Sequence, residues 1–368
     1  MSRGILKNIE WWILILASVL CVIGLVALYS TTQSSNFDDL HKQAIWLVVG
    51  FFIMLVISFI DYRILVRISP ILYGISILLL IFVLFTKSIN GASSWFNIGG
   101  FSLQPGEVAK VTVILFLAYV ISKIQAKGRG EINRLFKLPI VLSVVGLPVV
   151  LIIMQPDFGT AAAYIVALIM VLFVAGIDKK FIIFATILVV VGIPLAYKFV
   201  LPEHAKTRID VYLNPELDPR GAGYNIIQSK LAVGSGELFG MGLLKGNQTQ
   251  LGFLYPKTTD FIFAVIGEEM GFIVAGSVII LYVILITKAI YVAKTAKDDL
   301  GSYIAMGIAG IFLFHMVENI GMTMGLLPIT GVPLPFVSYG GSSLLTNLIL
   351  IAILLNISGR RQKTIFMQ

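Results

Sequence analysis

A few acidic and basic side chains stand at defined positions inside otherwise apolar stretches of this sequence, and they are the groups best suited to chemistry. Glu107 and Lys110 are three residues apart, a spacing that places both on one face of a helix. Asp260 follows two threonines at the head of another apolar stretch. A carboxylate can act as a general base, and a lysine can hold a phosphate as a point charge. Asp157 and Asn347 are further polar groups at the ends of apolar stretches.

Each of these groups also has a structural interpretation. Glu107 and Lys110 can form an ion pair that only compensates itself. Asp260 stands where acidic residues favour a helix start, so its position alone favours a capping role. Glu268 and Glu269 lie about 100° apart around a helix, so we do not expect both to face one partner. At least one of them is expected to have a structural hydrogen-bonding role.

His315, Glu318 and Asn319 form a polar group in a later apolar stretch. The spacing of His315 and Glu318 resembles half of a metal site, but no second cluster in the sequence completes it. A hydrogen-bonded contact between helices is the interpretation that we favour for this pair.

The elements that position these groups are indicated by composition. Hydrophobic residues make up 58% of the 368 residues and charged residues 12%, which is more apolar than a soluble domain. About twenty apolar residues span a bilayer as a helix. Suitable stretches are Trp11–Tyr29, Ala44–Ile60, Ile71–Phe85, Val108–Ser122, Leu138–Met154, Gly159–Gly176, Phe181–Val200, Phe261–Thr287, Ser302–Gly325 and Gly340–Ile357. We therefore predict an all-α, polytopic integral membrane protein with about ten transmembrane helices.

Lysine and arginine gather in alternate connecting segments, and the short segments between them hold only Lys42 and Lys87. By the positive-inside rule this places both termini in the cytoplasm. The prediction is one membrane domain over residues 1–368, with helices 1–7 at about 11–200 and helices 8–10 at about 261–358. The net charge of +8 is thus mostly an orientation signal. The sequence has no clustered basic face with aromatic residues, so it does not predict nucleic-acid binding.

One large extracytoplasmic loop, at about 201–260, separates predicted helices 7 and 8. A loop of this length is usually functional or disordered. Within it, Gly223–Val233 has apolar residues at helical spacing and is predicted to form a short helix at the membrane surface. The predicted topology also places nearly all the ionisable groups within the spans in their outer halves. This distribution predicts a polar cavity open to the outer leaflet.

Several motifs occur along the chain in order. They are Asn90–Trp95, Gln104–Lys110, Pro156–Thr160, Gln228–Ser229 with Gly234–Gly236, Thr259–Phe263 leading into Gly267–Glu269, and Pro335–Ser343. Together they strongly resemble the SEDS family (shape, elongation, division and sporulation), and the resemblance runs from the first span to the last. Two positions depart from the family pattern: Gly106 replaces the usual serine, and Lys257 replaces a common glutamate.

The resemblance implies a function. SEDS proteins are peptidoglycan glycosyltransferases that polymerise lipid II at the outer face of the bacterial cytoplasmic membrane, beside a class B penicillin-binding protein that crosslinks the strands. Asp260 matches the family's essential catalytic aspartate, Gln104, Glu107 and Lys110 match its QPSE-type motif, and Asp157 matches its PDxGT motif. Overall similarity favours the branch that serves cell elongation, with other proteins of the elongation complex as further partners.

The expected site follows from the motifs and the chemistry of lipid II. Asp260 is expected to act as general base, directly or by holding a divalent ion such as Mg²⁺ or Mn²⁺. Lys110 and Arg208 are expected to neutralise the pyrophosphate, with Glu107 orienting Lys110 and with Asp157 and Gln104 near the substrate. Residues expected to support the cavity are Glu268, Glu269, Glu318 and Ser338.

Two other functions remain open at this stage. A flippase for lipid-linked precursors needs a polar path through the cytoplasmic half of the spans, and those half-spans are nearly all apolar. A non-catalytic scaffold of the elongation machinery would tolerate the loss of Asp260.

Overall fold

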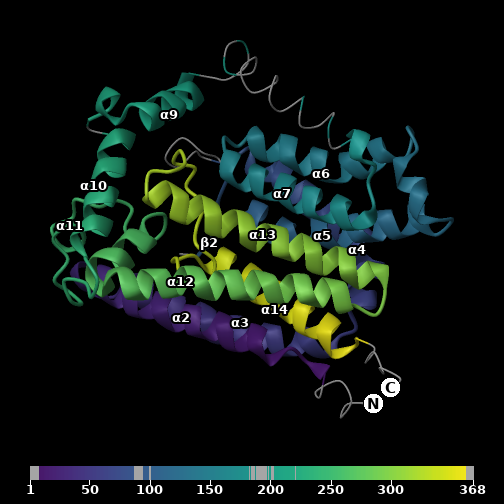
Figure 1. Ribbon diagram of the computed structural model, residues 1–368, viewed down its shortest axis with the longest axis horizontal. Coiled ribbons are helices and arrows are strands. Elements are labelled where there is room, and N and C mark those ends of the chain that lie inside the picture. The colour runs from purple at the N-terminus through teal and green to yellow at the C-terminus, as the bar shows by residue number, and fades with distance from the viewer. Residues whose placement is uncertain are drawn as a thin grey trace.

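The computed structural model describes residues 8–86, 94–98, 101–181, 203–219 and 221–361, together with residues 183, 187, 197 and 199. The described chain is helical apart from one small two-stranded ribbon (Figure 1). Its long helices are α2 (Trp11–Thr31), α3 (Asp38–Phe59), α4 (Tyr62–Val83), α5 (Pro105–Gln125), α6 (Leu138–Ile153), α7 (Phe158–Ala175), α12 (Ile262–Thr295), α13 (Asp299–Thr323) and α14 (Gly341–Gly359). The antiparallel ribbon pairs β1 (Phe96–Ile98) with β2 (Phe101–Leu103), in the register Phe96 to Leu103.

Shorter elements occupy the connections. They are the 3-10 helices η1 (Gln33–Ser35), η2 (Arg129–Asn133) and η3 (Pro215–Leu217), and the helices α9 (Glu203–Leu213), α10 (Ala222–Ser235) and α11 (Asn247–Gln250). The helix predicted over Gly223–Val233 is therefore confirmed as α10.

The prediction of an all-α polytopic membrane protein is confirmed. Seven helices of the described chain are long and apolar enough to cross a membrane: α2, α3, α4, α7, α12, α13 and α14. Helix α6 is a shorter apolar helix, and α5 contains the buried Glu107 and Lys110. The predicted span Phe181–Val200 falls almost entirely outside the described residues. Each of the other predicted spans coincides with one of these helices.

Helices α13 and α14 lie at the centre of the bundle. In the apolar window of α14 83% of the residues are buried, compared with 17% in α3, whose outer face is apolar and open. Helix α13 packs against α7 and α12, and α14 packs against α3. At Gly310 of α13 an added Cβ would lie only 2.8 Å from the Cα of Ala167 in α7. The missing side chain allows this close approach, as is common between membrane helices.

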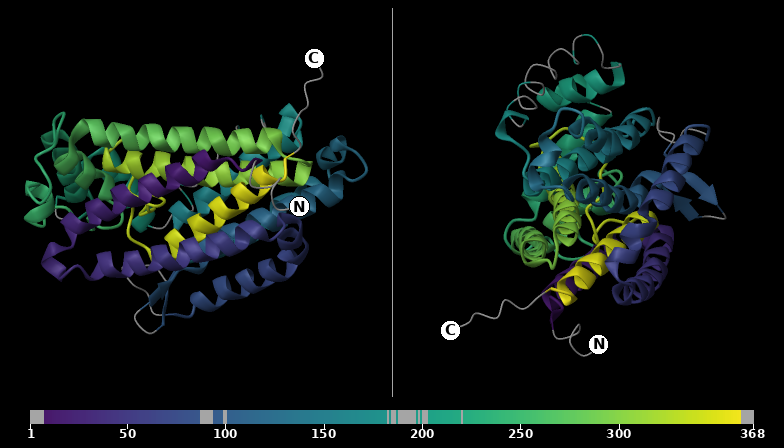
Figure 2. Two further views of the ribbon diagram at one scale, coloured as in Figure 1. Left: turned by 90° about the horizontal axis from the view of Figure 1, so that it is seen from below. Right: turned by 90° about the vertical axis from the view of Figure 1, so that its right-hand side faces the viewer.

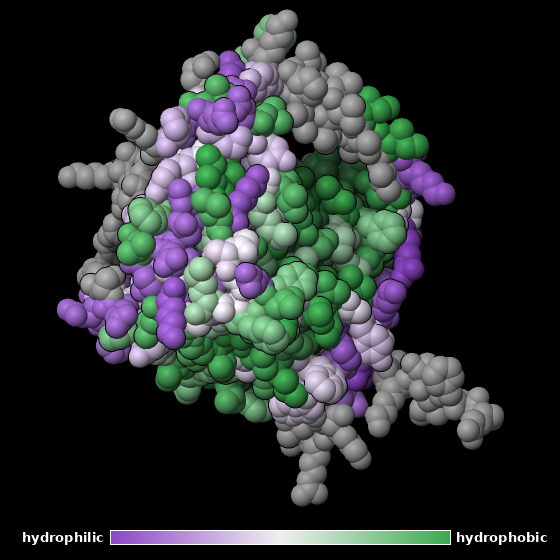
Figure 3. All heavy atoms as spheres, turned by 60° about the vertical axis from the view of Figure 1, so that its left-hand side comes forward, coloured by the Kyte–Doolittle hydropathy of each residue, from purple (hydrophilic) through white to green (hydrophobic). Residues whose placement is uncertain are grey.

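The outer surface suits a lipid environment. Large apolar side chains stand exposed along the helices, including Phe52, Ile71 and Phe173, which are 70%, 69% and 71% exposed. Figure 3 shows one face on which hydrophobic side chains cover a wide area and hydrophilic side chains gather toward one side. Such a surface marks a membrane or protein contact.

The two ends of the bundle carry different connecting elements. Helices α9, α10 and α11 lie at one end, with α10 and α11 beside the start of α12, and the long helices of the bundle run alongside one another from there (Figures 1 and 2). The two ends of the described chain meet each other, because Glu10, just before α2, pairs with Lys288 at 2.8 Å and with Arg361 at 3.3 Å. The start of α2 and the end of α14 therefore lie on the same side of the bundle.

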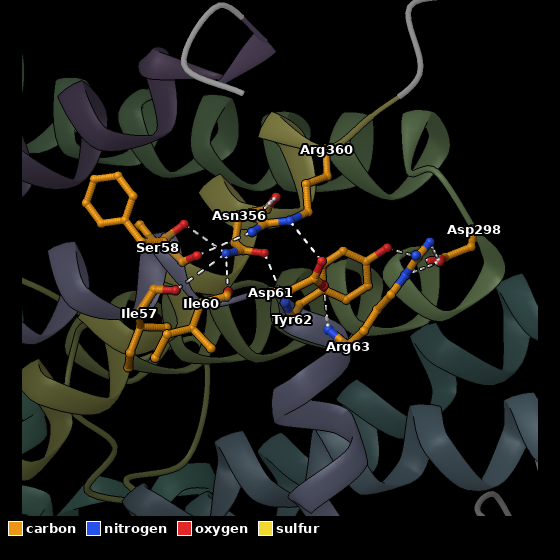
Figure 4. A network of polar contacts seen from close by, with 10 residues as sticks. Ile57, Ser58, Ile60, Asp61, Tyr62, Arg63, Asp298, Asn356 and Arg360 are labelled. Carbon is orange, nitrogen blue, oxygen red and sulfur yellow. Dashed lines mark hydrogen bonds and ion pairs between the residues drawn. The ribbon is translucent and has the colours of Figure 1, made fainter. Parts of the chain in front are cut away.

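A polar network closes the connection between α3 and α4 (Figure 4). The Asn356 side chain donates to the carbonyls of Ile57, Ser58 and Ile60 and accepts from the N–H of Tyr62. It thus satisfies carbonyls that the end of α3 leaves without helical partners.

A second part of the same network is centred on Asp298, just before α13. The side chain of Arg63 and the hydroxyl of Tyr62 donate to its carboxylate, and so does the N–H of Gly301 (Figure 4). Burial disfavours the charged form of Asp298, but these hydrogen bonds outweigh it and hold the pKa of Asp298 below its ordinary value. The contacts join α4 to the start of α13.

Replacing Asn356 with leucine should destabilise the protein, because buried carbonyls then lose their donor. The expected loss is about 1–3 kcal/mol, the usual cost of an unsatisfied buried polar group. Thermal unfolding in detergent measures it. Asn133→Leu is the control, since Asn133 makes similar bonds to Gly176 and Asp178 in an exposed connection. Equal losses in both variants would contradict the role of burial.

Candidate active site

A polar pocket of about 540 Å³ lies where the loops between the helices converge. Its lining comes from five of the sequence motifs, from two further loops and from helix α10. The lining residues are Ser94, Trp95, Gln104, Pro156, Asp157, Thr160, Asn225, Tyr255, Pro256, Thr259, Asp260, Thr330, Gly331, Pro333, Tyr339, Gly340, Ser342 and Ser343. Segments that are up to 249 residues apart in sequence, from Ser94 to Ser343, thus meet at one place.

Asp260 lies in this pocket and does not cap a helix. Helix α12 begins at Ile262, its N-cap is Phe261, and no side-chain hydrogen bond caps it. The capping role that position alone favoured is therefore wrong, because the turn over residues 255–261 places the carboxylate one residue before the cap. The Asp260 carboxylate lies beside Gly331, where an added Cβ would stand 3.5 Å from its Oδ2.

The main chain around Asp260 is held by side chains from other elements. Ser338 donates its hydroxyl to the carbonyl of Thr259 at 2.6 Å, and the Tyr339 N–H donates to the carbonyl of Thr258 at 2.9 Å. Asn319 of α13 donates to the carbonyl of Asp260 itself at 2.9 Å. The supporting role expected of Ser338 agrees with this placement.

Asp157 and Gln104 form a hydrogen-bonded pair in the pocket wall. Gln104 Nε2 donates to Asp157 Oδ2 at 2.8 Å, and the N–H of Thr160 donates to Asp157 Oδ1 at 3.0 Å. Burial raises the pKa of the Asp157 carboxyl and outweighs the opposing hydrogen bond from Thr160. The pair ties α5 to the start of α7, where Asp157 is the N-cap.

Lys110 lies beneath the pocket and is not among its lining residues. Its Nζ donates to Glu107 Oε1 at 2.6 Å and lies 2.7 Å from His315 Nε2, and the side chains of both Lys110 and Glu107 are only 1% exposed. This contact is one through which Glu107 can orient Lys110. In this arrangement Lys110 cannot contact a ligand in the pocket directly, because protein partners enclose its ammonium group.

One face of α13 supports the pocket wall. His315, Glu318 and Asn319 follow the spacing of one helix face. His315 Nδ1 lies 2.9 Å from the carbonyl of Pro333, and Glu318 accepts from the Thr330 hydroxyl at 2.8 Å. His315 thus makes the predicted contact between helices, through its Nε2 and Lys110 of α5, while its Nδ1 and Glu318 contact the loop that lines the pocket.

Glu268 and Glu269 contact one segment together, contrary to the prediction from their angular separation. Glu268 accepts from the N–H groups of Gln248 and Thr249 at 2.7 and 3.0 Å, and Glu269 accepts from Gln250 Nε2 at 2.8 Å. Their angular separation does not prevent this, because the connection between α10 and α12 wraps around this turn, just before the interruption of α12 at Gly271, with φ 79°. The two glutamates support α11 and do not line the pocket.

The neighbouring Lys257 donates to the carbonyl of Thr249 at 3.0 Å. Burial lowers the pKa of Lys257, and Glu269 acts in the opposite direction. The lysine that departs from the family pattern therefore fixes the same segment as the two glutamates.

Some residues were not anticipated or lie outside the description. Thr330, Gly331 and Asn225 line the pocket, but their types and local pattern carry no signal that separates them from other polar or small residues of the loops and of α10. The sequence shows Asn319 as a polar residue in a predicted span. It does not show the two hydrogen-bond partners of Asn319, because only folding brings them together. The side chain of Arg208, in α9, lies outside the described part of the chain.

The described lining of the pocket includes two carboxylates, Asp157 and Asp260, and no lysine or arginine. Among the described residues no three histidine, cysteine, aspartate or glutamate side chains come together as a metal site. An ion at Asp260 would therefore have to take most of its ligands from the substrate and water, as Mg²⁺ bound to phosphates usually does.

A multi-pass membrane protein with a polar pocket at one end of its helices is the class that the fold and the site define. The chain belongs to the family of FtsW, RodA and SpoVE, described as cell cycle proteins, whose family model matches residues 9–363. This confirms the resemblance to the SEDS family that the motifs indicated.

Individual relatives match over nearly their whole length. The peptidoglycan glycosyltransferase RodA of Treponema pallidum is 32% identical, over 98% of this chain and 99% of the relative. The probable peptidoglycan glycosyltransferase FtsW of Trichlorobacter lovleyi is 39% identical, over 94% and 92%. A chain from a structure of a peptidoglycan synthase complex that coordinates polymerization and crosslinking superimposes with a TM-score of 0.82, at 28% identity over 95% of this chain and 97% of that chain.

The buried pair beneath the pocket leads to a test by single and double substitution. Glu107→Leu should cost about 3–5 kcal/mol, because Lys110 is left as a buried charge without its carboxylate. The double variant Glu107→Leu with Lys110→Met should be more stable than that single variant, since no charge remains to be compensated. Thermal unfolding of the purified proteins measures both. If the double variant lost as much stability as Glu107→Leu and Lys110→Met lose separately, added together, the two charges would not depend on each other.

Proposed function

We propose that this protein is a peptidoglycan glycosyltransferase that polymerises lipid II into glycan strands at the outer face of the bacterial cytoplasmic membrane, in the service of cell elongation and shape. The observation that carries the proposal is the pocket in which five motifs of the family meet, with the Asp260 carboxylate in its lining. The names of the relatives support the same reaction.

The chemistry required matches a carboxylate in a polar pocket beside a lipid-facing bundle. Lipid II carries a disaccharide-pentapeptide on a polyprenyl pyrophosphate, so its sugars lie at the interface and its tail in lipid. The 4-hydroxyl oxygen of the acceptor sugar attacks C1 of the donor sugar, and the bond from C1 to the pyrophosphate oxygen breaks. Asp260 takes the hydroxyl proton as general base. The change from an α-linked pyrophosphate to a β-linked product is one inverting displacement and requires no covalent enzyme intermediate.

Charges around the pocket would stabilise the leaving pyrophosphate. Arg208 is our candidate for direct contact, since α9 belongs to the extracytoplasmic connection. Lys110 would act from beneath the pocket as a fixed positive charge, which a low-dielectric surrounding makes effective at a distance. Gln104 and Asp157, paired in the wall, would hydrogen-bond to the substrate.

A divalent cation, Mg²⁺ or Mn²⁺, is part of the proposal as a partner of the pyrophosphate. In this alternative form of the proposal Asp260 would hold the ion instead of taking the proton directly, and the ion would supply further positive charge where the leaving group forms. The steps above are assigned to the side chains of this chain and do not pass through the ion.

The membrane setting and the partners follow from the charge bias and the relatives. We infer that the termini are cytoplasmic, because lysine and arginine gather on that side of the predicted topology. The similar chain from a complex of polymerization and crosslinking supports a class B penicillin-binding protein as the partner. Other proteins of the elongation complex and membrane lipids complete the proposed surroundings.

Transport of the precursor across the membrane is less well supported. A flippase requires the inner end of the helices to open. The network around Asn356 and Asp298 ties together α3, α4, α13 and α14 at the end that we infer to be cytoplasmic (Figure 4).

Asp260→Ala should lower strand formation about 10²–10⁴-fold, the usual contribution of a general base. The measurement uses purified protein with its cognate class B partner, lipid II and a divalent cation, and detects glycan strands on a gel. Asp178→Asn is the matched control, because Asp178 is an exposed aspartate whose carboxylate pairs with Lys180. Its activity should equal that of the wild type.

Strands from wild type and from the Asp178 variant, but not from Asp260→Ala, are the predicted result. Equal strands from all three proteins would remove Asp260 from the chemistry and favour a scaffold. An absence of strands from every protein, with the partner present and all proteins folded, would contradict the proposed polymerase.

A further inference from the structure

Asn319 joins the two sides of the pocket by its side-chain amide. Its Nδ2 donates to the carbonyl of Asp260 at 2.9 Å and to the carbonyl of Val332 at 2.8 Å, and the residue is fully buried. The amide nitrogen of asparagine carries two N–H donors in a fixed plane. Both donors are used here, one on the segment before α12 and one on the loop between α13 and α14.

These two carbonyls belong to the segments that meet at the Asp260 carboxylate. Asp260 supplies the proposed base, and Val332 follows Gly331, the residue that faces the Asp260 carboxylate. The hydrogen bonds that hold the main chains at Asp260 and Val332 therefore set the distance between the Asp260 carboxylate and the opposite wall of the pocket. Asn319 fastens both to α13, a helix buried at the centre of the bundle.

The neighbours of Asn319 fix the same loop at other points. His315 reaches the carbonyl of Pro333, and Glu318 accepts from the hydroxyl of Thr330. Asn319 is the member of this α13 face that donates to the Asp260 main chain. It therefore differs from a residue that only stabilises the loop.

We propose that Asn319 is a positioning residue, which sets the place of the Asp260 carboxylate relative to the acceptor hydroxyl by holding the Asp260 and Val332 carbonyls together. The proposal rests on the proposed polymerase function. Its effect belongs to the chemical step, because a base displaced by about 1 Å can cost 10²-fold in rate while substrate binding changes little.

The test compares Asn319→Asp with Asn356→Asp. Both changes are isosteric, and both replace donors to main-chain carbonyls by a carboxylate oxygen, but Asn356 lies in the network of Figure 4, away from the pocket. The kcat and KM for lipid II are measured for folded protein with the class B partner. Hydrogen exchange of residues 256–262 and 330–338 is followed by mass spectrometry without substrate. Asn319→Ser, which keeps one hydroxyl donor but cannot span both carbonyls, replaces Asn319→Asp if that variant does not fold.

The proposal predicts a fall in kcat of about 100-fold for the Asn319 variant with KM changed less than about threefold, and faster exchange in both segments. Asn356→Asp should retain the wild-type kcat per folded molecule and the wild-type exchange in these segments. A wild-type kcat in the Asn319 variant would overturn the proposal, and so would unchanged exchange in either segment. If wild-type protein forms no strands, the polymerase fails, and the exchange result alone still decides whether Asn319 holds the two segments.

Discussion

The pocket depends on a stretch of non-helical main chain, residues 324–340, that lies between two membrane helices and needs hydrogen-bond partners. Lipid offers no partners to main-chain N–H and C=O groups, so irregular backbone between membrane helices has to be satisfied by protein or by water in a cavity. Here the carbonyls of Val332, Pro333 and Pro335 accept from Asn319, His315 and Tyr282. Gln43 of α3 accepts from the N–H of Gly340 and donates to the carbonyl of Ser338, so three helices, α3, α12 and α13, supply partners to this stretch.

This requirement explains why polar residues of otherwise apolar helices cluster at the pocket end of the bundle. Asn319 and Gln43 are fully or almost fully buried, and each serves the main chain of a pocket loop. The close packing has the same purpose: an added Cβ on Gly24 of α2 would lie 2.7 Å from the main chain of Val337. The rigid helices thus fix the shape of the loop. As a result, the Asp260 carboxylate beside the loop is held in a defined position. Sites built on such rigid supports hold reactive groups more accurately than free loops do.

The sequence predicted the helices, their orientation signal and the motif residues of the pocket, because hydrophobic length and charge bias are local properties. It could not predict which polar groups meet. The angular argument separated Glu268 from Glu269, yet both contact residues 246–250, since the irregular turn at Gly271 and the wrapped connection are tertiary features. Position alone favoured Asp260 as a cap, and the turn that carries it into the pocket is held by Ser338 and Asn319, far along the chain. Lys110 was expected at the pyrophosphate, and its enclosure by Glu107 and His315 appears only in three dimensions.

The most direct test of the central claim, that the pocket around Asp260 binds the lipid-linked disaccharide, is photo-crosslinking with a lipid II analogue that carries a photoreactive group on its sugar. Labelled peptides are identified by mass spectrometry after irradiation in the presence of the partner protein. Labels within residues 155–160, 255–260 and 330–343, suppressed by an excess of unmodified lipid II, are the predicted result. Labels confined to the connections on the side of Asn356 and Asp298, or labels that lipid II does not suppress, would contradict the account.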